Sequence, residues 1–350
     1  MNKAPMLAPL LLVHIAVLAA CGTDSPETVL APGARILASS SAQGSPWSEP
    51  LNLGPPVNSP AVEQNPTLSR DELSLYFVSN RTDLPGALGG NDMWVSHRAC
   101  LACPWETPVN LGPVVNSSSG DAGPNLSVDG HLLFFTSNRP DELGSTDNDI
   151  YVSHRADPKD DFGWGPPVKL GSDVNSTLSE FGPDFLESAE DGAANLYFQR
   201  GLAGGHPTND IYYAAVTRDG ETRGPAVSVV ELNDPTVADG SPTVRKDGRE
   251  VFFNSTRSGR LGSVDIWVST RRNVHRAWST PENLGPPVNI SGLAGVGTRD
   301  PDLSFDGRTL LFMSNRPGSV LRLDGVPSDD IWMSTRTSRG EDDPREARER

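Results

Sequence analysis

The stretch PNLSVDGHLLFFTSNR, residues 124–139, decides the fold, because its pattern returns along the chain at a nearly constant interval. A proline opens each copy, a turn follows, and a run of β-forming residues then leads to an arginine. The steps between successive opening prolines are 58, 59, 59 and 59 residues, and the prolines are Pro66, Pro124, Pro183, Pro242 and Pro301. Self-similarity at a fixed period is typical of a repeat architecture.

Each copy contains the signals of four strands. Four copies carry Asp-Gly in the first turn, which predicts a type I′ hairpin with positive φ at both residues; the first copy has Asp71-Glu72 instead. A third strand starts with an aspartate, and a fourth segment carries a tryptophan in four of the five copies. Four β-segments without helical periodicity between them predict the blade of a propeller. The strand-opening aspartates are Asp92, Asp149, Asp210, Asp265 and Asp330.

The two ends of the repeat region predict how the ring closes. The region starts with a fourth-strand segment at residues 47–53 and stops after a third strand at residues 330–334. The first segment can therefore complete the last blade. We predict an all-β fold, in which residues 45–338 form a single five-bladed β-propeller of four-stranded repeats, closed by an N-terminal strand and monomeric.

The motif Pro-x-Leu-Ser-x-Asp-Gly, followed by aromatic-Phe-x-Ser-Asn-Arg and Asp-Ile-Trp, resembles the WD40-like (PD40) repeat. That repeat occurs in propellers similar to the one in TolB, and the resemblance covers residues 47–336. It implies the propeller fold but says little about function, because propellers serve many roles. The chain has no separate N-terminal domain of the TolB kind, so a role in that system does not carry over.

The N-terminal residues are typical of an export signal. Lys3 precedes the short apolar stretch 6–20, and residues 1–20 are predicted to be a signal peptide. Residues 18–22, Leu-Ala-Ala-Cys-Gly, resemble a bacterial lipobox, which implies lipidation of Cys21; the alternative is an ordinary signal peptide that leaves Cys21 free. The residue after the cysteine is Gly22 and not an aspartate, so the resemblance favours the outer over the inner membrane of the cell envelope.

The segments that flank the propeller have the composition of unstructured chain. Residues 21–44 are rich in Ser, Ala, Pro and Gly, which predicts a flexible tether between lipid and propeller. Residues 339–350 form a mixed-charge run that is predicted to be disordered.

The charge and the motifs narrow the function. The formal net charge is −16, which disfavours nucleic acid and anionic lipid headgroups as partners. Gly-x-Ser-x-Gly, His-Glu-x-x-His and Gly-x₄-Gly-Lys motifs are missing from the sequence. The expected partner is an envelope protein, a peptide or a polysaccharide, and no organic cofactor is predicted.

Cys100 and Cys103 are the cysteines that follow Cys21 in the sequence. In an oxidising exported compartment they are expected to form a disulfide that closes a short loop. The redox reading of a C-x-x-C motif would need a thioredoxin-like helical context, which the sequence does not show.

One candidate site lies at the mouth of the central channel. Three residues before the repeat proline, four copies carry a carboxylate, and the fifth breaks the pattern with Thr298-Arg299-Asp300. The four could form an acidic ring that binds Ca²⁺. Alternatively, each could bind backbone amides or the repeat arginine of its own blade. The ring residues are Glu63, Asp121, Glu180 and Asp239, and the repeat arginines are Arg81, Arg139, Arg200, Arg257 and Arg316.

Function is predicted as a non-catalytic propeller scaffold that binds a ligand of the cell envelope. The alternative is a glycoside hydrolase-like enzyme with carboxylates at the central channel, since that chemistry needs two carboxylates in unlike environments. Inward-facing carboxylates that occur in single blades would favour the enzyme, whereas a symmetric ring would not. His97 and His154, at equivalent ends of third strands, are expected to face solvent.

Overall fold

The computed structural model describes residues 46–140, 144–187, 194–202 and 209–336. The predicted signal peptide, Cys21, the tether and the charged tail lie outside these ranges, so the predictions about export and anchoring stay predictions. In the described ranges, no helix has the length and apolar character needed to cross a membrane.

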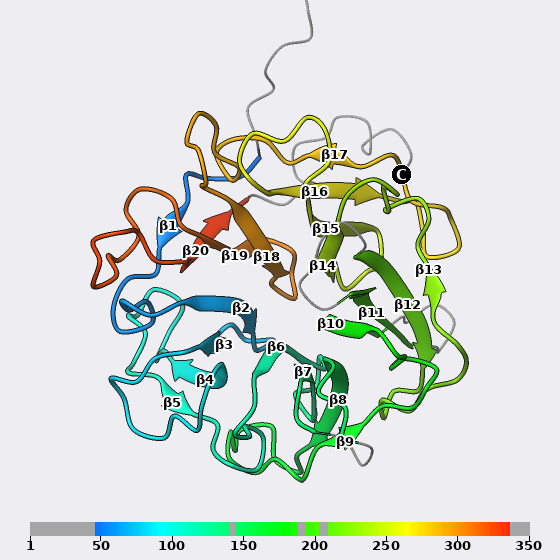
Figure 1. Ribbon diagram of the computed structural model, residues 1–350, viewed down its shortest axis with the longest axis horizontal. Coiled ribbons are helices and arrows are strands. Elements are labelled where there is room, and N and C mark those ends of the chain that lie inside the picture. Colours follow the sequence, from blue (N-terminus) through cyan, green and yellow to red (C-terminus); the bar gives the residue numbers. More distant parts are fainter. Residues whose placement is uncertain (1–45, 141–143, 188–193, 203–208, 337–350) are drawn as a thin grey trace, which may run out of the picture. The chain divides into compact units, whose positions relative to one another are not determined.

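The described chain forms five four-stranded antiparallel sheets arranged in a ring, so the prediction of a five-bladed β-propeller is confirmed (Figure 1). In four blades the strands follow one another in sequence order from the centre outward. The strands, blade by blade, are β2 (Glu63–Leu68), β3 (Ser74–Ser79), β4 (Asp92–His97) and β5 (Val109–Asn110); β6 (Asp121–Leu126), β7 (Leu132–Ser137), β8 (Asp149–His154) and β9 (Val168–Lys169); β10 (Ser179–Glu187), β11 (Ala194–Gly201), β12 (Asp210–Val216) and β13 (Val227–Ser228); β14 (Asp239–Val244), β15 (Glu250–Ser255), β16 (Asp265–Thr270) and β17 (Glu282–Asn283); and β18 (Thr298–Leu303), β19 (Thr309–Ser314), β20 (Asp330–Thr335) and β1 (Leu51–Asn52).

The N-terminal strand closes the ring as predicted. β1 pairs with β20 in the fifth blade, with Leu51 opposite Met333. Just before β1, Trp47 forms a bridge with Arg336 and lies under its guanidinium, 4.5 Å from ring centroid to Cζ. The two ends of the described chain are therefore joined within one blade, which gives the fifth blade four strands like the others and closes the ring.

The core lies between the blades. The buried strand residues form five apolar clusters, and each cluster combines side chains from adjacent blades. In the cluster between blades 5 and 1, for example, Leu311 and Ile331 pack with Phe77 and Trp94. Strands buried on both faces explain the continuous apolar runs seen in the sequence.

In the second, fourth and fifth blades, the Asp-Gly turn differs from its prediction. In the turn at 127–130, Gly130 has φ 75° but Asp129 does not have positive φ, so the expectation of a type I′ turn is wrong. The carboxylate of Asp129 instead accepts hydrogen bonds from Ser127 Oγ (2.6 Å) and from the amide of His131 (3.1 Å). These bonds hold the aspartate in an ordinary conformation, and only the glycine must turn left-handed.

Every innermost strand contains a bulge directly before the repeat proline. The pairing register shifts at this point in all five blades. The bulged residue has positive φ each time, and it is glycine in two blades but a residue with a side chain in three. A bulge redirects a side chain, so these positions determine what faces the channel. The bulged residues are Asn65 (φ 46°), Gly123 (60°), Gly182 (62°), Ser241 (46°) and Asp300 (51°).

Candidate functional site

The four carboxylates of the predicted ring are fully buried, and each is bound inside its own blade. All four have a relative exposure of 0%. The repeat arginine of the same blade forms an ion pair with each of them. The N···O distances are 3.0 Å for Arg81–Glu63, 2.6 Å for Arg139–Asp121, 2.8 Å for Arg200–Glu180 and 2.5 Å for Arg257–Asp239.

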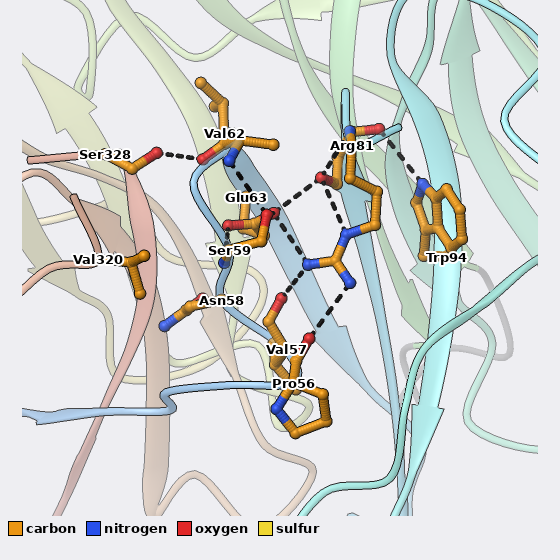
Figure 2. A network of polar contacts seen from close by, with 12 residues as sticks. Pro56, Val57, Asn58, Ser59, Val62, Glu63, Arg81, Trp94, Val320 and Ser328 are labelled. Atoms are coloured by element: carbon orange, nitrogen blue, oxygen red, sulfur yellow. Dashed lines mark hydrogen bonds and ion pairs between the residues drawn. The ribbon is translucent and has the colours of Figure 1, made fainter. Parts of the chain in front are cut away.

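The first blade shows the full network (Figure 2). Glu63 accepts hydrogen bonds from the amide and the hydroxyl of Ser59 (2.8 and 2.7 Å) and from Ser79 Oγ (2.8 Å), beside its pair with Arg81. The sequence left open whether each carboxylate binds backbone amides or the arginine of its own blade, and Glu63 binds both. In the described ranges, no group of three or more His, Cys, Asp or Glu side chains is placed to hold a metal ion, and calcium binding at the ring stays a prediction.

The repeat arginines also stack on aromatic rings. Arg81 lies over Phe77 and over Trp94, with Cζ 5.7 Å from each ring centroid, and the other four blades repeat the arrangement. A guanidinium over an aromatic face adds an electrostatic attraction to the packing. The prediction that these arginines form ion pairs within their own blades is confirmed in four blades.

The fifth blade differs because Thr298 stands where the other blades have a carboxylate. Arg316 therefore binds Thr298 Oγ1 (3.1 Å) together with the carbonyl oxygens of Val288 and Pro287. Its residue exposure is 5%. Burial lowers the pKa of Arg316 to about 10. A buried cation that is bound by neutral acceptors is less stabilised than one paired with a carboxylate, so this position lowers the stability of the fifth blade.

Replacing Thr298 by aspartate should stabilise the propeller. The new carboxylate would face Arg316 as Asp121 faces Arg139, and a hydrogen bond to a charged group contributes about 1.5–3 kcal/mol. The uncharged variant Thr298→Asn has a similar shape and is expected to change the stability little. Melting temperatures of the two variants check this, and equal destabilisation by both would contradict it.

A pocket of about 400 Å³ opens at the mouth of the channel, on the face that carries the loops between second and third strands. Side chains from blades 1, 3, 4 and 5 line it, including five primary amides and Phe181. Pockets that bind small molecules have volumes of this order. The amides in its wall are Gln64, Asn65, Gln199 and Asn254, and a fifth, Asn209, also borders it.

Two buried amides in this wall are incompletely bonded. Asn65 and Asn209 have exposures of 8% and 9%, and the side-chain oxygen of each has no hydrogen-bond partner. Buried polar atoms are normally paired, so each such atom calls for an explanation, of which an unseen hydrogen-bond donor is one. Hydroxyl groups of a ligand or of water would supply such donors.

Asp300 is the half-buried carboxylate of this pocket. It occupies the bulge position of the fifth blade, where φ is 51°. Its Oδ1 accepts hydrogen bonds from Ser241 Oγ (2.9 Å) and Asn254 Nδ2 (3.3 Å) of the neighbouring blade. Burial raises the pKa of Asp300, while the charge of Arg299 opposes this shift and the charge of Asp329 adds to it. A residue with a side chain held in the left-handed region is strained, and such strain clusters at functional sites.

Arg299 and Asp329 accompany Asp300. Arg299 lies in the pocket wall, and its guanidinium is 3.6 Å from Asp329 Oδ1. Arg299 Nε and Asp329 Oδ1 are buried without a hydrogen-bond partner. The positions equivalent to Asp329 hold asparagine in three blades and valine in the fourth. The fifth blade therefore concentrates three charged side chains at positions that are neutral in the other blades.

The channel narrows below the pocket. A cavity of about 40 Å³ lies on the axis between the innermost strands, and Asp184 and Asp302 border it from blades 3 and 5. Val244 N (2.9 Å) and Asn125 Nδ2 (3.1 Å) donate to Asp184. Asp302 accepts from Thr67 Oγ1 (3.1 Å) and Leu68 N (3.3 Å) of the first blade. Each carboxylate thus links its blade to the next one, and the narrow cavity has room for water but not for a sugar ring.

Sequence reasoning missed the cluster of the fifth blade. It noticed that Thr298-Arg299-Asp300 breaks the carboxylate pattern but treated the break only as a gap in the ring. Asp329 could have been found by the same comparison, because it precedes a strand-opening aspartate where other blades carry Asn91, Asn148 and Asn209. The signal that could have identified Asp300 and Asp329 was that both differ from the residues at the equivalent positions of the other repeats.

Two other groups of predicted residues lie at the outer part of the ring. Cys100 and Cys103 form a disulfide in the loop that follows β4. His154 is exposed, as expected. The side chain of His97 is 44% exposed, in line with the expectation, and its Nε2 also contacts Asp161 Oδ2.

Comparison with solved structures finds propellers of glycoside hydrolases. An α-L-arabinofuranosidase from Lactobacillus brevis matches with a TM-score of 0.53 and 13% identity, over 82% of this chain and 94% of that chain. A thermostable family-43 glycoside hydrolase matches with a TM-score of 0.54 and 14% identity, over 82% and 93%. A putative TolB from Agrobacterium tumefaciens matches with a TM-score of 0.44 and 16% identity, over 80% and 84%. Neither a protein-family model nor a curated protein sequence matches the chain.

These comparisons correct the functional prediction. The preference for a non-catalytic scaffold is wrong, because glycoside hydrolases are among the solved structures that match with a TM-score above 0.5. At such low identity the likeness establishes the fold alone, and the assignment to the WD40-like repeat family stays a prediction.

Proposed function

We propose that this protein is a glycoside hydrolase-like enzyme whose reaction centre is the channel-mouth pocket of the fifth blade. The observation that carries the proposal is the asymmetry of that blade. Asp300 and Asp329 are carboxylates at positions that are neutral in the other four blades, and Arg299 lies beside them. Structural contacts that recur with the repeat do not require charged side chains at these positions in one blade.

The two carboxylates suit the chemistry because their environments differ. Glycosidic bond cleavage uses one carboxylic acid to protonate the leaving oxygen and one carboxylate as base or nucleophile. Burial raises the pKa of Asp300, which suits it to the role of the acid. Asp329 lies 3.6 Å from the guanidinium of Arg299, and we assign it the role of base or nucleophile.

The pocket supports the binding of a saccharide. Its volume of about 400 Å³ accommodates sugar residues, and its amides can exchange hydrogen bonds with hydroxyl groups. Phe181 provides an aromatic surface in the same wall. The constriction of about 40 Å³ below would hold the reacting sugar at the mouth, next to Asp300.

Hydrolysis of aryl glycosides tests the proposal. The mature protein is expected to release 4-nitrophenol from at least one member of a panel that starts with 4-nitrophenyl α-L-arabinofuranoside. Asp300→Asn is expected to lower the rate by about 10²–10⁴-fold, because it removes proton transfer to the leaving oxygen. Asp329→Asn is expected to lower it as well.

The matched control is Asp324→Asn. Asp324 lies in the same blade-five loop as Asp329, but its side chain is 57% exposed. Its substitution is expected to leave the rate unchanged. Failure to cleave any glycoside of the panel, or full activity of Asp300→Asn, would refute the proposed function.

A further inference from the structure

A second group of reactive side chains lies between blades 1 and 2, outside the channel. Ser74 begins β3 and His97 ends β4, and the two residues are direct partners in the antiparallel pair. Ser74 Oγ is 3.1 Å from His97 Nδ1, and His97 Nε2 is 2.8 Å from Asp161 Oδ2. A hydroxyl, an imidazole and a carboxylate are thus joined in line.

The tautomer of His97 follows from these contacts. An ionised carboxylate can only accept hydrogen bonds, so Asp161 takes the N–H of His97 Nε2. The lone pair of Nδ1 then faces Ser74 and can accept its hydroxyl proton. This is the relation among nucleophile, base and orienting carboxylate that defines a hydrolytic triad, which is recognised by geometry and not by chain order.

Asp161 is held rigidly enough to orient the imidazole. It comes from the loop between β8 and β9 of the second blade and is 7% exposed. Arg155 Nη1 donates to its Oδ1 (2.8 Å), and the hydroxyl of Tyr76 also donates to Oδ1. His97 contacts the other oxygen, Oδ2, which is free of these two bonds. Asp161 is therefore a positioning residue.

The reactive side of the group is open to small molecules. The side chain of His97 is 44% exposed. The loop closed by the Cys100–Cys103 disulfide starts beside Ser74, because the amide of Arg98 donates to the carbonyl of Leu73 (3.0 Å).

The arrangement occurs in one blade. In the other blades the pair equivalent to Ser74–His97 is Leu132–His154, Ala194–Val216, Glu250–Thr270 or Thr309–Thr335. Blade 2 keeps the histidine but opposes it with leucine. A purely structural contact would recur with the repeat, as the buried arginine pairs do.

We propose that Ser74 is an activated nucleophile that accepts the acyl group of small activated esters, with His97 as its base. Ser74 Oγ forms a bond to the ester carbonyl carbon while its proton moves to His97 Nδ1. The carbon–oxygen bond to the leaving group then breaks, and His97 returns the proton to that oxygen, which releases an alcohol or phenol. Water attacks the acyl-serine in the same way, giving the carboxylic acid and restoring the Ser74 hydroxyl.

Activated esters are the expected class because a good leaving group reduces the need for other stabilisation of the transition state. The site is separate from the channel, since its residues belong to the start of β3, the end of β4 and a loop of blade 2, and none of them lines the two channel cavities. It adds a second activity and does not rest on the proposed glycoside hydrolase function.

Covalent labelling tests this inference. The mature protein is incubated with a fluorophosphonate, which phosphonylates activated serines, and the labelled peptide is identified by mass spectrometry. We expect the label on Ser74, together with hydrolysis of 4-nitrophenyl acetate. His97→Gln should lower the labelling rate by about 10²-fold or more, because the general base is lost.

Two variants keep the test decisive. Ser74→Ala is expected to abolish labelling of that peptide. His154→Gln changes the equivalent histidine of blade 2, which faces Leu132, and is expected to leave the labelling rate unchanged. Circular dichroism confirms that each variant is folded. Absence of label on Ser74, or an unchanged rate in folded His97→Gln, would overturn the proposal.

Discussion

Replacing Arg81 by methionine is expected to lower the free energy of unfolding by about 3–5 kcal/mol, because it leaves a buried charge without its partner. The side chains of Arg81 and Glu63 are 1% and 0% exposed, and their contact is 3.0 Å. Methionine has a similar length and keeps much of the packing against Phe77 and Trp94. The main loss is therefore electrostatic. Denaturant unfolding at pH 7, followed by tryptophan fluorescence, measures it.

The fifth blade supplies the control for this prediction. Arg316 is buried like Arg81 and stacks on equivalent rings, but Thr298 takes the place of the carboxylate. Arg316→Met leaves no charged group behind, so its cost should be clearly smaller than that of Arg81→Met. Equal losses in the two variants would show that packing, and not the ion pair, sets the cost.

The stability of the propeller is expected to depend on pH through Asp302. Burial raises the pKa of Asp302 to about 7, and the charge of Asp184 adds to the effect while Lys246 opposes it. The ordinary value in an unfolded chain is 3.8. The folded state thus binds the proton more tightly than the unfolded state. The contribution of this group is fully present below about pH 4 and is lost as the pH rises towards 7.

The size of the effect follows from the shift. A pKa shift of one unit corresponds to about 1.4 kcal/mol, so the change across this window is at most about 4 kcal/mol. Asp302→Asn keeps the contacts to Thr67 and Leu68 within reach but cannot ionise. The variant should therefore gain stability relative to the natural protein between pH 4 and pH 7.5.

The comparison between variant and natural protein is needed because other carboxylates act in both directions. Burial raises the pKa of Asp330 to about 6, which adds to the loss at higher pH. Asp129 acts oppositely, because hydrogen bonds from Ser127 and the amide of His131 outweigh its burial and lower its pKa. Asp324→Asn, at an exposed carboxylate, serves as the control. A stability difference between Asp302→Asn and the natural protein that is the same at both pH values would contradict the prediction.

The fold was predictable because the physical cause of each blade is local and repeated. The proline that opens the innermost strand, the turn residues and the aspartate of the third strand recur at one period, so a single interpretation had to explain five copies. The missing fourth strand at the end and the extra one at the start determined the closure, and β1 indeed pairs with β20.

The candidate site was less predictable because it depends on contacts between blades. Sequence reasoning placed Glu63 and its equivalents in a ring, but it could not determine whether they faced the channel or their own arginines. The bulge before the repeat proline directs the side chain of the bulged residue towards the channel, and no residue pattern in the sequence predicted that bulge. Asp300 therefore lies in the pocket, whereas Asp239 is the one ring carboxylate among the described residues that borders it.

The amino-acid sequence by itself determined the number of blades, the closure of the ring and the buried arginines, because all of these follow from one repeated local pattern. The tertiary structure alone decided which carboxylates remain accessible, since burial and hydrogen bonding depend on residues about 59 or more positions away, as in the contact of Ser241 with Asp300. It also brought Asp161 of one blade to His97 of another. Side-chain contacts between neighbouring blades leave no residue pattern within a single repeat, and they form only when the blades pack against one another.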